Sequence, residues 1–154
     1  MIFTETKLPG AYVIDLEPIV DSRGFFARAW CEEEFAEHGL ETRIAQCNMS
    51  FNERKGTLRR IHFQRSPHKE TKLVWTGVEL SADNRRMLYV PRGFAHGFQT
   101  LEERTEIFYM ASEFYTPGTE GGVRWNDPAF GIEWPLREPS VISDKDASWP
   151  DFAG

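Results

Sequence analysis

Residues 87–112 read MLYVPRGFAHGFQTLEERTEIFYMAS, and this stretch contains three short runs in which apolar and polar residues alternate. The runs cover residues 87–90, 95–101 and 105–112, and are separated by residues 91–94 and 102–104. Alternation with a period of two is typical of β-strands that bury one face. We therefore expect three consecutive strands in this part of the chain.

The same alternation recurs through the rest of the chain. Further strands are expected over residues 11–18, 25–30, 43–50, 58–64 and 72–80, with turn dipeptides such as Pro9-Gly10 and Arg23-Gly24 marking their ends. One short helix is expected at about residues 32–38, where three acids stand in the first turn and Gly39 follows as a stop. After Phe114, glycine and proline pairs indicate coil. The pattern predicts an all-β fold, such as a jelly-roll barrel or sandwich.

Composition limits the class of protein. A chain of 154 residues is expected to form a single domain, residues 1–154. Eighteen basic against 24 acidic residues argue against nonspecific binding to nucleic acid or acidic membranes. No apolar run approaches the roughly 18 residues of a membrane span, and residues 1–7 show no signal peptide. We expect a cytoplasmic protein whose two cysteines, Cys31 and Cys47, are reduced.

Two of the four histidines stand in unusual surroundings. His62 belongs to LRRIHFQ, residues 58–64, where charged and titratable residues interrupt an apolar pattern; an exposed edge strand is the alternative interpretation. His96 is flanked by small and aromatic residues and is expected to point into a cavity. His38 is expected to cap the short helix, and His68 to be solvated in a turn.

A metal site has to be considered, because Pro91-x-Gly93-x-x-His96 matches half of the motif of metal-binding cupins. Those proteins take two further ligands from a His-x-His element, and the corresponding residues here are His62-Phe63-Gln64. A site built from neutral imidazoles and a carboxylate would lack one imidazole. The ligand count therefore disfavours a metal.

Acid/base chemistry is the other possibility, since it needs a base that titrates near pH 7, a group that orients it and an acid opposite. His62 is a candidate base, and a carboxylate in residues 142–146 is a candidate orienting group. Tyr109 alternates with apolar neighbours and is a candidate acid, with a core aromatic as the alternative interpretation.

Eight segments together resemble the dTDP-4-dehydrorhamnose 3,5-epimerases, a family of nucleotide-sugar enzymes with a cupin-type jelly-roll fold. The segments are residues 21–26, 46–48, 58–64, 72–74, 77–84, 90–98, 125–128 and 143–146. The resemblance covers nearly the whole chain. It implies conversion of dTDP-4-dehydro-6-deoxy-D-glucose to dTDP-4-dehydro-L-rhamnose, with no cofactor and no metal, by an isomerase that forms homodimers. The N-terminal strand, residues 1–7, offers an edge for such pairing.

The resemblance also implies roles for individual residues. The general base falls on His62, its orienting carboxylate on Asp146 and the general acid on Tyr109, while Lys72 supplies positive charge for the enolate oxygen. The implied substrate contacts are Arg23, Gln46, Asn48, Arg59, His96, Glu120 and Lys145.

Three departures from the family pattern are visible. Arg60 replaces a glycine before the base, and Arg28 replaces a glutamate that contacts substrate. After Val74 the chain continues directly into Trp75-Thr76-Gly77-Val78, whereas the family has roughly 20 more residues there, about two strands and a turn. Two alternatives therefore remain beside the enzyme: a degenerate, non-catalytic sugar-nucleotide binder, and a metal cupin.

Overall fold

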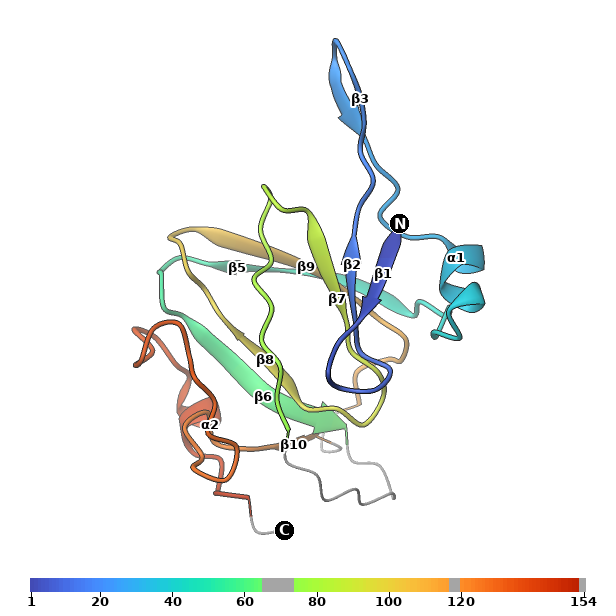
Figure 1. Ribbon diagram of the computed structural model, residues 1–154. Coiled ribbons are helices and arrows are strands. Elements are labelled where there is room, and N and C mark those ends of the chain that lie inside the picture. Colours follow the sequence, from blue (N-terminus) through green and yellow to red (C-terminus); the bar gives the residue numbers. More distant parts are fainter. Residues whose placement is uncertain (65–73, 117–119, 153–154) are drawn as a thin grey trace. The chain divides into compact units, whose positions relative to one another are not determined.

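Short antiparallel strands make up most of the regular structure (Figure 1). The computed structural model describes residues 1–64, 74–116 and 120–152. The chain divides into two compact units, of which one comprises Met1–Arg43 with Trp75–Pro91 and the other Ile44–Val74 with Arg92–Gly154. The junction between Val74 and Trp75 is therefore also a boundary between units. No helix of the described part is long and apolar enough to cross a membrane.

The first unit contains an antiparallel sheet with the order β1-β2-β7. Its strands are β1 (Ile2–Glu5), β2 (Tyr12–Asp15) and β7 (Arg86–Tyr89). Ile14 of β2 is 1% exposed and belongs to the core of the chain, together with Phe35. Phe35 packs edge-on against both Phe3 and Tyr89. A separate hairpin, β3 (Ile19–Asp21) with β4 (Gly24–Phe26), carries Arg23 at its turn.

Helix α1 (Glu32–Glu37) confirms the expected short helix. Its three acids stand in the first turn, and Gly39 adopts a φ of 69° that favours glycine over other residues. His38 occupies the C-cap, with Nδ1 2.8 Å from the carbonyl oxygen of Glu34. The capping role expected for His38 is therefore confirmed.

The second unit contains the remaining strands that the structure describes. One pair is β5 (Gln46–Asn52) with β9 (Thr105–Ala111). The other sheet has the order β10-β6-β8, with β6 (Leu58–Gln64) between β8 (His96–Gln99) and β10 (Glu120–Gly122). Helix α2 (Asp144–Ala147) packs against β6. Among the described residues of this unit, the buried apolar side chains are Leu58, Ile61 and Val123.

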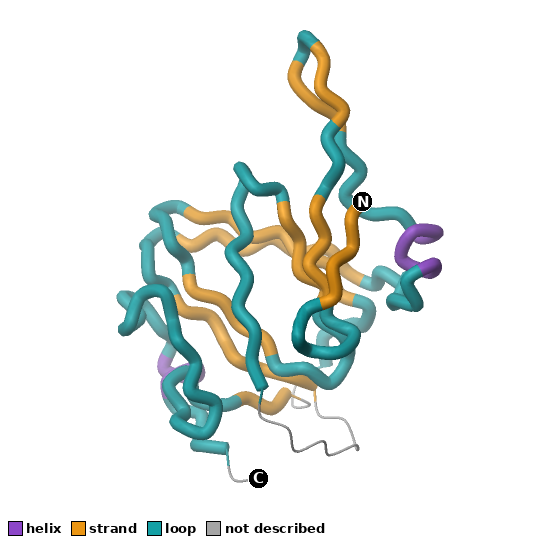
Figure 2. The backbone as a smooth tube through the Cα atoms, in the orientation of Figure 1, coloured by secondary structure: helices purple, strands orange, loops and turns teal. Residues whose placement is uncertain are grey.

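Between β10 and α2 the chain is mostly loop (Figure 2); backbone hydrogen bonds attach it to β6, and hydrogen bonds with the Gln99 side chain attach it to β8. Val141 forms a parallel bridge with Thr57, and its carbonyl accepts a hydrogen bond from the Leu58 amide at 2.9 Å. Gln99 and Leu136 exchange two hydrogen bonds of 2.9 Å. These bonds fix the approach of the loop to α2.

The strand pattern was predicted well but not everywhere. Residues 74–80 form no strand (Figure 2), and the rest of that expected strand lies outside the described residues. The side chain of Asn84 donates to the carbonyl of Glu79 at 2.9 Å, so this backbone is satisfied by a local loop. The expected strand over residues 25–30 ends at Phe26. Conversely, β10 and α2 lie where only coil was expected.

Candidate functional site

A β-bulge in β6 determines where the side chains of the site point. Leu58 pairs with Gln99 and Arg59 with Phe98, but His62 then pairs with His96. Arg60 and Ile61 together therefore oppose a single residue of β8, Gly97. Such an extra residue bends the strand and shifts the side chains that follow it.

The bulge brings Arg59 and His62 to the same side of β6. In a regular strand residues three apart point to opposite faces. Leu58 and Ile61 are also three apart, yet both are buried, at 1% and 8% exposure. Since Leu58 and Ile61 share the core side, Arg59 and His62 share the other side.

His62 is half-buried and lies against His96, with ring centroids 4.7 Å apart and planes inclined by 48°. His96 itself is exposed, whereas its small and aromatic neighbours in the sequence had indicated a ring turned away from solvent into a cavity.

The β5–β9 pair presents a polar face and an apolar face. Gln46, Asn48 and Asn52 alternate along β5 with exposed residues. Asn48 lies directly opposite Tyr109 of β9, which is 50% exposed and is therefore not an enclosed core aromatic. Gln46 accepts a hydrogen bond through Oε1 from the amide of Tyr115 at 3.0 Å.

Arg59 joins β6 to β5. Its Nε donates to Oδ1 of Asn52 at 2.7 Å, and its Nη2 donates to the carbonyl of Phe51 at 3.3 Å. Asn52 is only 2% exposed and donates in turn to the carbonyl of Thr105 at 3.1 Å. The guanidinium is therefore held by a buried amide, although Arg59 as a whole remains exposed.

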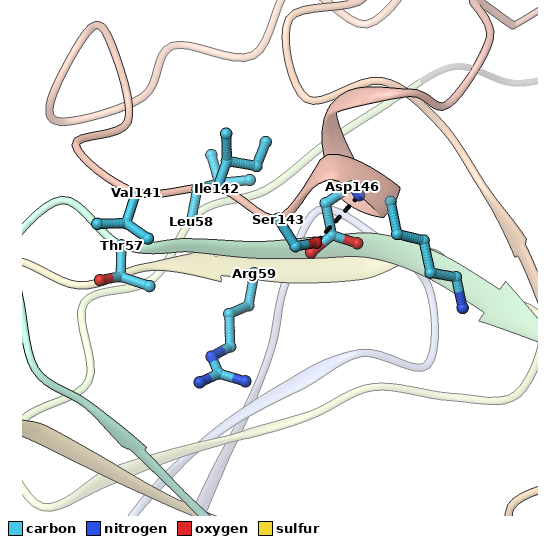
Figure 3. Close-up of a pocket in the computed structure, with 8 residues that line it drawn as sticks. Thr57, Leu58, Arg59, Val141, Ile142, Ser143 and Asp146 are labelled. Atoms are coloured by element: carbon cyan, nitrogen blue, oxygen red, sulfur yellow. Dashed lines mark hydrogen bonds between the residues drawn. The ribbon is translucent and has the colours of Figure 1, made fainter.

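A cavity of about 320 Å³ lies between β6 and the α2 segment (Figure 3). Its lining residues are Thr57, Leu58, Arg59, Val141, Ile142, Ser143, Lys145 and Asp146. Ser143 caps α2 by accepting a hydrogen bond from the Asp146 amide at 3.1 Å. Asp146 is 8% exposed, and Figure 3 shows it beside the strand that carries Arg59. Arg59 and Lys145 add positive charge to a cavity that also contains this carboxylate.

Most of the expected site residues lie in the second unit. His62, Arg59 and His96 come from β6 and β8, Asp146 and Lys145 from α2, and Gln46, Asn48 and Tyr109 from β5 and β9. Glu120 begins β10, where its backbone pairs with Gln64. Lys72 lies outside the described residues.

Arg23 lies in the first unit, in the β3–β4 hairpin, and the structure does not join it to the others. Its Nη2 is 2.6 Å from Oδ2 of Asp21, and its side chain is 88% exposed. The hydrogen bonds from the Arg23 side chain and amide hold the pKa of Asp21 below its usual range. In turn, Asp21 raises the pKa of Arg23.

Sequence reasoning missed two features of this site. The α2 segment was expected as coil, although Ser143-x-x-Asp146 has the spacing of an N-terminal capping motif. The contact between His62 and His96 depends on the bulge, for which the alternation of β6 gives no signal. Within the described residues, no cluster of three or more histidine, cysteine or acidic side chains could hold a metal ion.

Comparisons of the sequence with a family model and with individual relatives point to the same family. A sequence model of the family described as dTDP-4-dehydrorhamnose 3,5-epimerase matches residues 5–76 and 74–154. A relative of that name from Salmonella typhimurium is 37% identical over 174 aligned positions, covering 97% of this chain and 94% of its own. Another, from Methanothermobacter thermautotrophicus, is 38% identical over 171 positions, covering 96% and 92%.

Solved structures of the same name are also similar. One from Elizabethkingia anophelis has a TM-score of 0.91 at 33% identity, covering 99% of this chain and 96% of that one. One from Bacillus anthracis, with TDP and PPi bound, has a TM-score of 0.90 at 33% identity, covering 98% and 99%. These similarities confirm the all-β, cupin-type jelly-roll fold that the strand pattern predicted.

The comparisons also bear on the junction after Val74. Both alignments with the relatives are longer than the 154 residues of this chain, so each relative has residues without a counterpart here. The family is matched as two segments that meet at residues 74–76. This division agrees with an internal deletion at that point.

Proposed function

This chain belongs to the dTDP-4-dehydrorhamnose 3,5-epimerase family, and we propose that it converts dTDP-4-dehydro-6-deoxy-D-glucose to dTDP-4-dehydro-L-rhamnose. The reaction is an isomerisation that inverts the carbons on both sides of the C4 keto group. A proton leaves one face of each carbon and another arrives on the opposite face. No electron is transferred, so the reaction needs no redox cofactor.

The bulge in β6 is the observation that supports this proposal most directly. It brings Arg59 and His62 to one side of the strand, beside His96 of the neighbouring strand. A base and cations on one side of a sheet suit a substrate that carries an acidic C–H and a diphosphate. A regular strand would place the base and the cation on opposite sides.

In the proposed mechanism His62 removes the proton next to the keto group. Asp146, on the helix that packs against β6, orients the imidazole and stabilises its protonated form. Tyr109, half-exposed on β9, delivers a proton to the opposite face. Lys72 supplies positive charge for the enolate oxygen, which makes the C–H acidic enough to transfer.

Substrate recognition is assigned to the polar and basic residues around these groups. Arg59 and Lys145 line the cavity at α2 and are suited to a diphosphate. Gln46 and Asn48 present amides from the polar face of β5. Arg23, His96 and Glu120 complete the proposed set of contacts.

We extend the proposal to a homodimer that uses the apolar face of the β5–β9 pair. On this face Met49 is 67% exposed, Phe108 lies directly opposite it at 64%, and Phe51 is 44% exposed. A contiguous apolar surface of this kind is unusual on a monomer. A second copy of the chain is the occupant we propose, and β1, at the edge of its described sheet, offers a further pairing edge.

The test is incubation with the 4-keto sugar nucleotide in heavy water, followed by NMR of the sugar. Deuterium at carbons 3 and 5, together with the inverted product, is expected. Binding measured by calorimetry without deuterium incorporation would identify the degenerate binder instead. Elemental analysis of the purified protein tests the second alternative, a metal cupin. That alternative requires a metal bound in stoichiometric amount. The cytoplasmic location expected from the sequence remains a prediction.

A further inference from the structure

The segment after α2, residues 148–152, is attached to the chain that follows β10; we call it the C-terminal strap. Asp151 forms an ion pair with Arg124 at 2.8 Å. The amide of Phe152 donates to Oδ2 of Asp127 at 2.5 Å, and its ring packs edge-on against Phe130 with centroids 5.5 Å apart. The strap is therefore a docked segment rather than a loose end.

Trp149 packs tightly against the backbone of β10. A Cβ atom placed on Gly122 would lie 2.4 Å from Cε2 and 2.6 Å from Cδ2 of Trp149. Those distances are far inside van der Waals contact, so the indole lies directly on the backbone of β10 and only glycine permits it there. The indole Nε1 is buried and bonds to none of the described residues. Packing, rather than a hydrogen bond, places this ring.

The position of Gly122 connects this contact to the proposed general base. Gly122 pairs with His62 in the register of β10 and β6. The ring of Trp149 therefore rests on the strand next to the proposed base, at the point opposite it. Adjacent strands in a sheet are about 4.8 Å apart.

The α2 segment is held at both of its ends. Before the helix, Val141 forms a bridge with Thr57, and its carbonyl accepts a hydrogen bond from the Leu58 amide at the start of β6. After the helix, Trp149 packs on Gly122 at the end of β10. The one-turn helix between these attachments spans only Asp144–Ala147, so both attachments lie within five residues of Asp146. The direction of the helix therefore depends on these attachments as well as on its own packing against β6.

We propose that Trp149 is a positioning residue: by packing on Gly122 it sets the placement of α2, and thereby of the Asp146 carboxylate, relative to His62. The inference rests on the proposed function, in which Asp146 orients the base. Trp149 stands three positions after Asp146 in the chain. In this proposal it acts through the placement of Asp146 and contacts neither the substrate nor the reacting atoms.

The test is a double-mutant cycle with the deuterium-exchange rate as readout. Asp146→Asn and Trp149→Ala are each expected to slow exchange, the former by about 100-fold and the latter by about 10-fold. If Trp149 acts through the carboxylate, adding Trp149→Ala to Asp146→Asn costs nothing further, because residues that act as one unit are not additive. A purely structural role would lower the rate by the same factor in both backgrounds, and that result would overturn the inference.

Two controls separate positioning from loss of folding. Trp149→Phe keeps a ring on Gly122 and removes only an N–H that bonds to none of the described residues, so it is expected to retain activity within about twofold. Trp134→Ala removes a tryptophan whose Nε1 donates to the Trp125 carbonyl at 2.8 Å. Its effect on the rate is expected to be equal with and without Asp146→Asn. An inactive Trp149→Phe with an unchanged melting temperature would contradict packing as the mechanism.

Gly122→Ala provides the reciprocal test. In the wild-type background the added methyl group displaces the indole and is expected to slow exchange about as much as Trp149→Ala. With Trp149→Ala already present the methyl group has room, so Gly122→Ala is expected to cost little more. Additive losses would overturn the inference. Absence of exchange in the wild-type protein would refute the proposed function itself, and it is distinguished from these outcomes because it appears before any variant is made.

Discussion

His62 and His96 lie directly opposite each other on β6 and β8, with ring centroids 4.7 Å apart. The register that follows the bulge in β6 brings the two rings together. The contact joins the proposed base to a proposed substrate-binding residue. A displacement of either ring would therefore change the surroundings of the other.

Replacement of His62 by asparagine is expected to abolish deuterium exchange at both carbons, with a loss of about a thousandfold or more. The amide keeps a polar group of similar size but cannot accept the proton. Exchange is measured by NMR and the fold by circular dichroism. His38→Asn, at the end of α1, is the matched control and should leave the rate unchanged; retention of substantial exchange by His62→Asn would remove it from the role of base.

Tyr109→Phe keeps the ring opposite Asn48 and removes only the phenol. Net inversion is expected to fall by about 100-fold while exchange of the carbon-bound protons falls much less. The reason is that His62 can still remove a proton and return a deuteron to the same face. The ratio of deuterium incorporation to inverted product measures this uncoupling, and an equal fall in both rates would contradict the assignment.

The Arg23–Asp21 ion pair predicts a local pH dependence in the β3–β4 hairpin. Because the Asp21 pKa is lowered in the folded protein, the stabilising contribution of the pair is complete above the ordinary value of about 3.9. It is lost as the pH falls from there through the lowered pKa. A carbon-13 NMR titration should show the Asp21 pKa rising in Arg23→Ala. Arg28→Ala is the control, since that guanidinium pairs with Glu34 at 3.0 Å.

A charge introduced on the apolar face of the β5–β9 pair is expected to disrupt the proposed homodimer. Phe108→Lys introduces a cation opposite Met49, where burial against a second copy would be costly. Light scattering should show a dimer for the wild-type protein and a monomer for the variant. Leu80→Lys, at an exposed residue outside these strands, should remain dimeric. A wild-type monomer at micromolar concentration would contradict the proposal.

Insertion of a relative's strand-turn-strand between Val74 and Trp75 is expected to raise both the melting temperature and the exchange rate. Lys72 precedes this junction by two residues, and a displacement of about 1 Å in a catalytic group can cost about 100-fold in rate. Two strands are an even number, so the direction of every later strand is unchanged by the insertion. A linker of equal length made of glycine and serine is the control, and it should raise neither quantity.

The sequence predicted the parts of the fold that depend on local alternation. β6 and β9 begin and end almost where the pattern of residues 58–64 and 105–112 placed them, and α1 follows from its acids and Gly39. β10 could not be predicted in this way, because Gly121 and Gly122 have no side chains to alternate and the strand forms only by pairing with β6. Long-range pairing decides such a segment.

The candidate site was predictable as a list of residues but not as an arrangement. The resemblance to the family indicated His62, Asp146 and Tyr109, yet their elements are far apart in the chain. The bulge that turns His62 toward His96, and the contact of Trp149 with Gly122, depend on residues brought together only by folding. The exposure of His96 was likewise missed, because neighbours along the chain do not determine what covers a side chain in the folded protein.

The bulge in β6 has a consequence for how this chain can change its length. Because the bulge is one extra residue, a single-residue deletion between Arg59 and His62 would leave them two apart on a regular strand and therefore on the same face. If the bulge were smoothed out without a deletion, or if one residue were removed from the regular part of the strand before His62, the imidazole would instead turn toward the layer now occupied by Ile61. Libraries that vary chain length should therefore leave the rest of β6 intact.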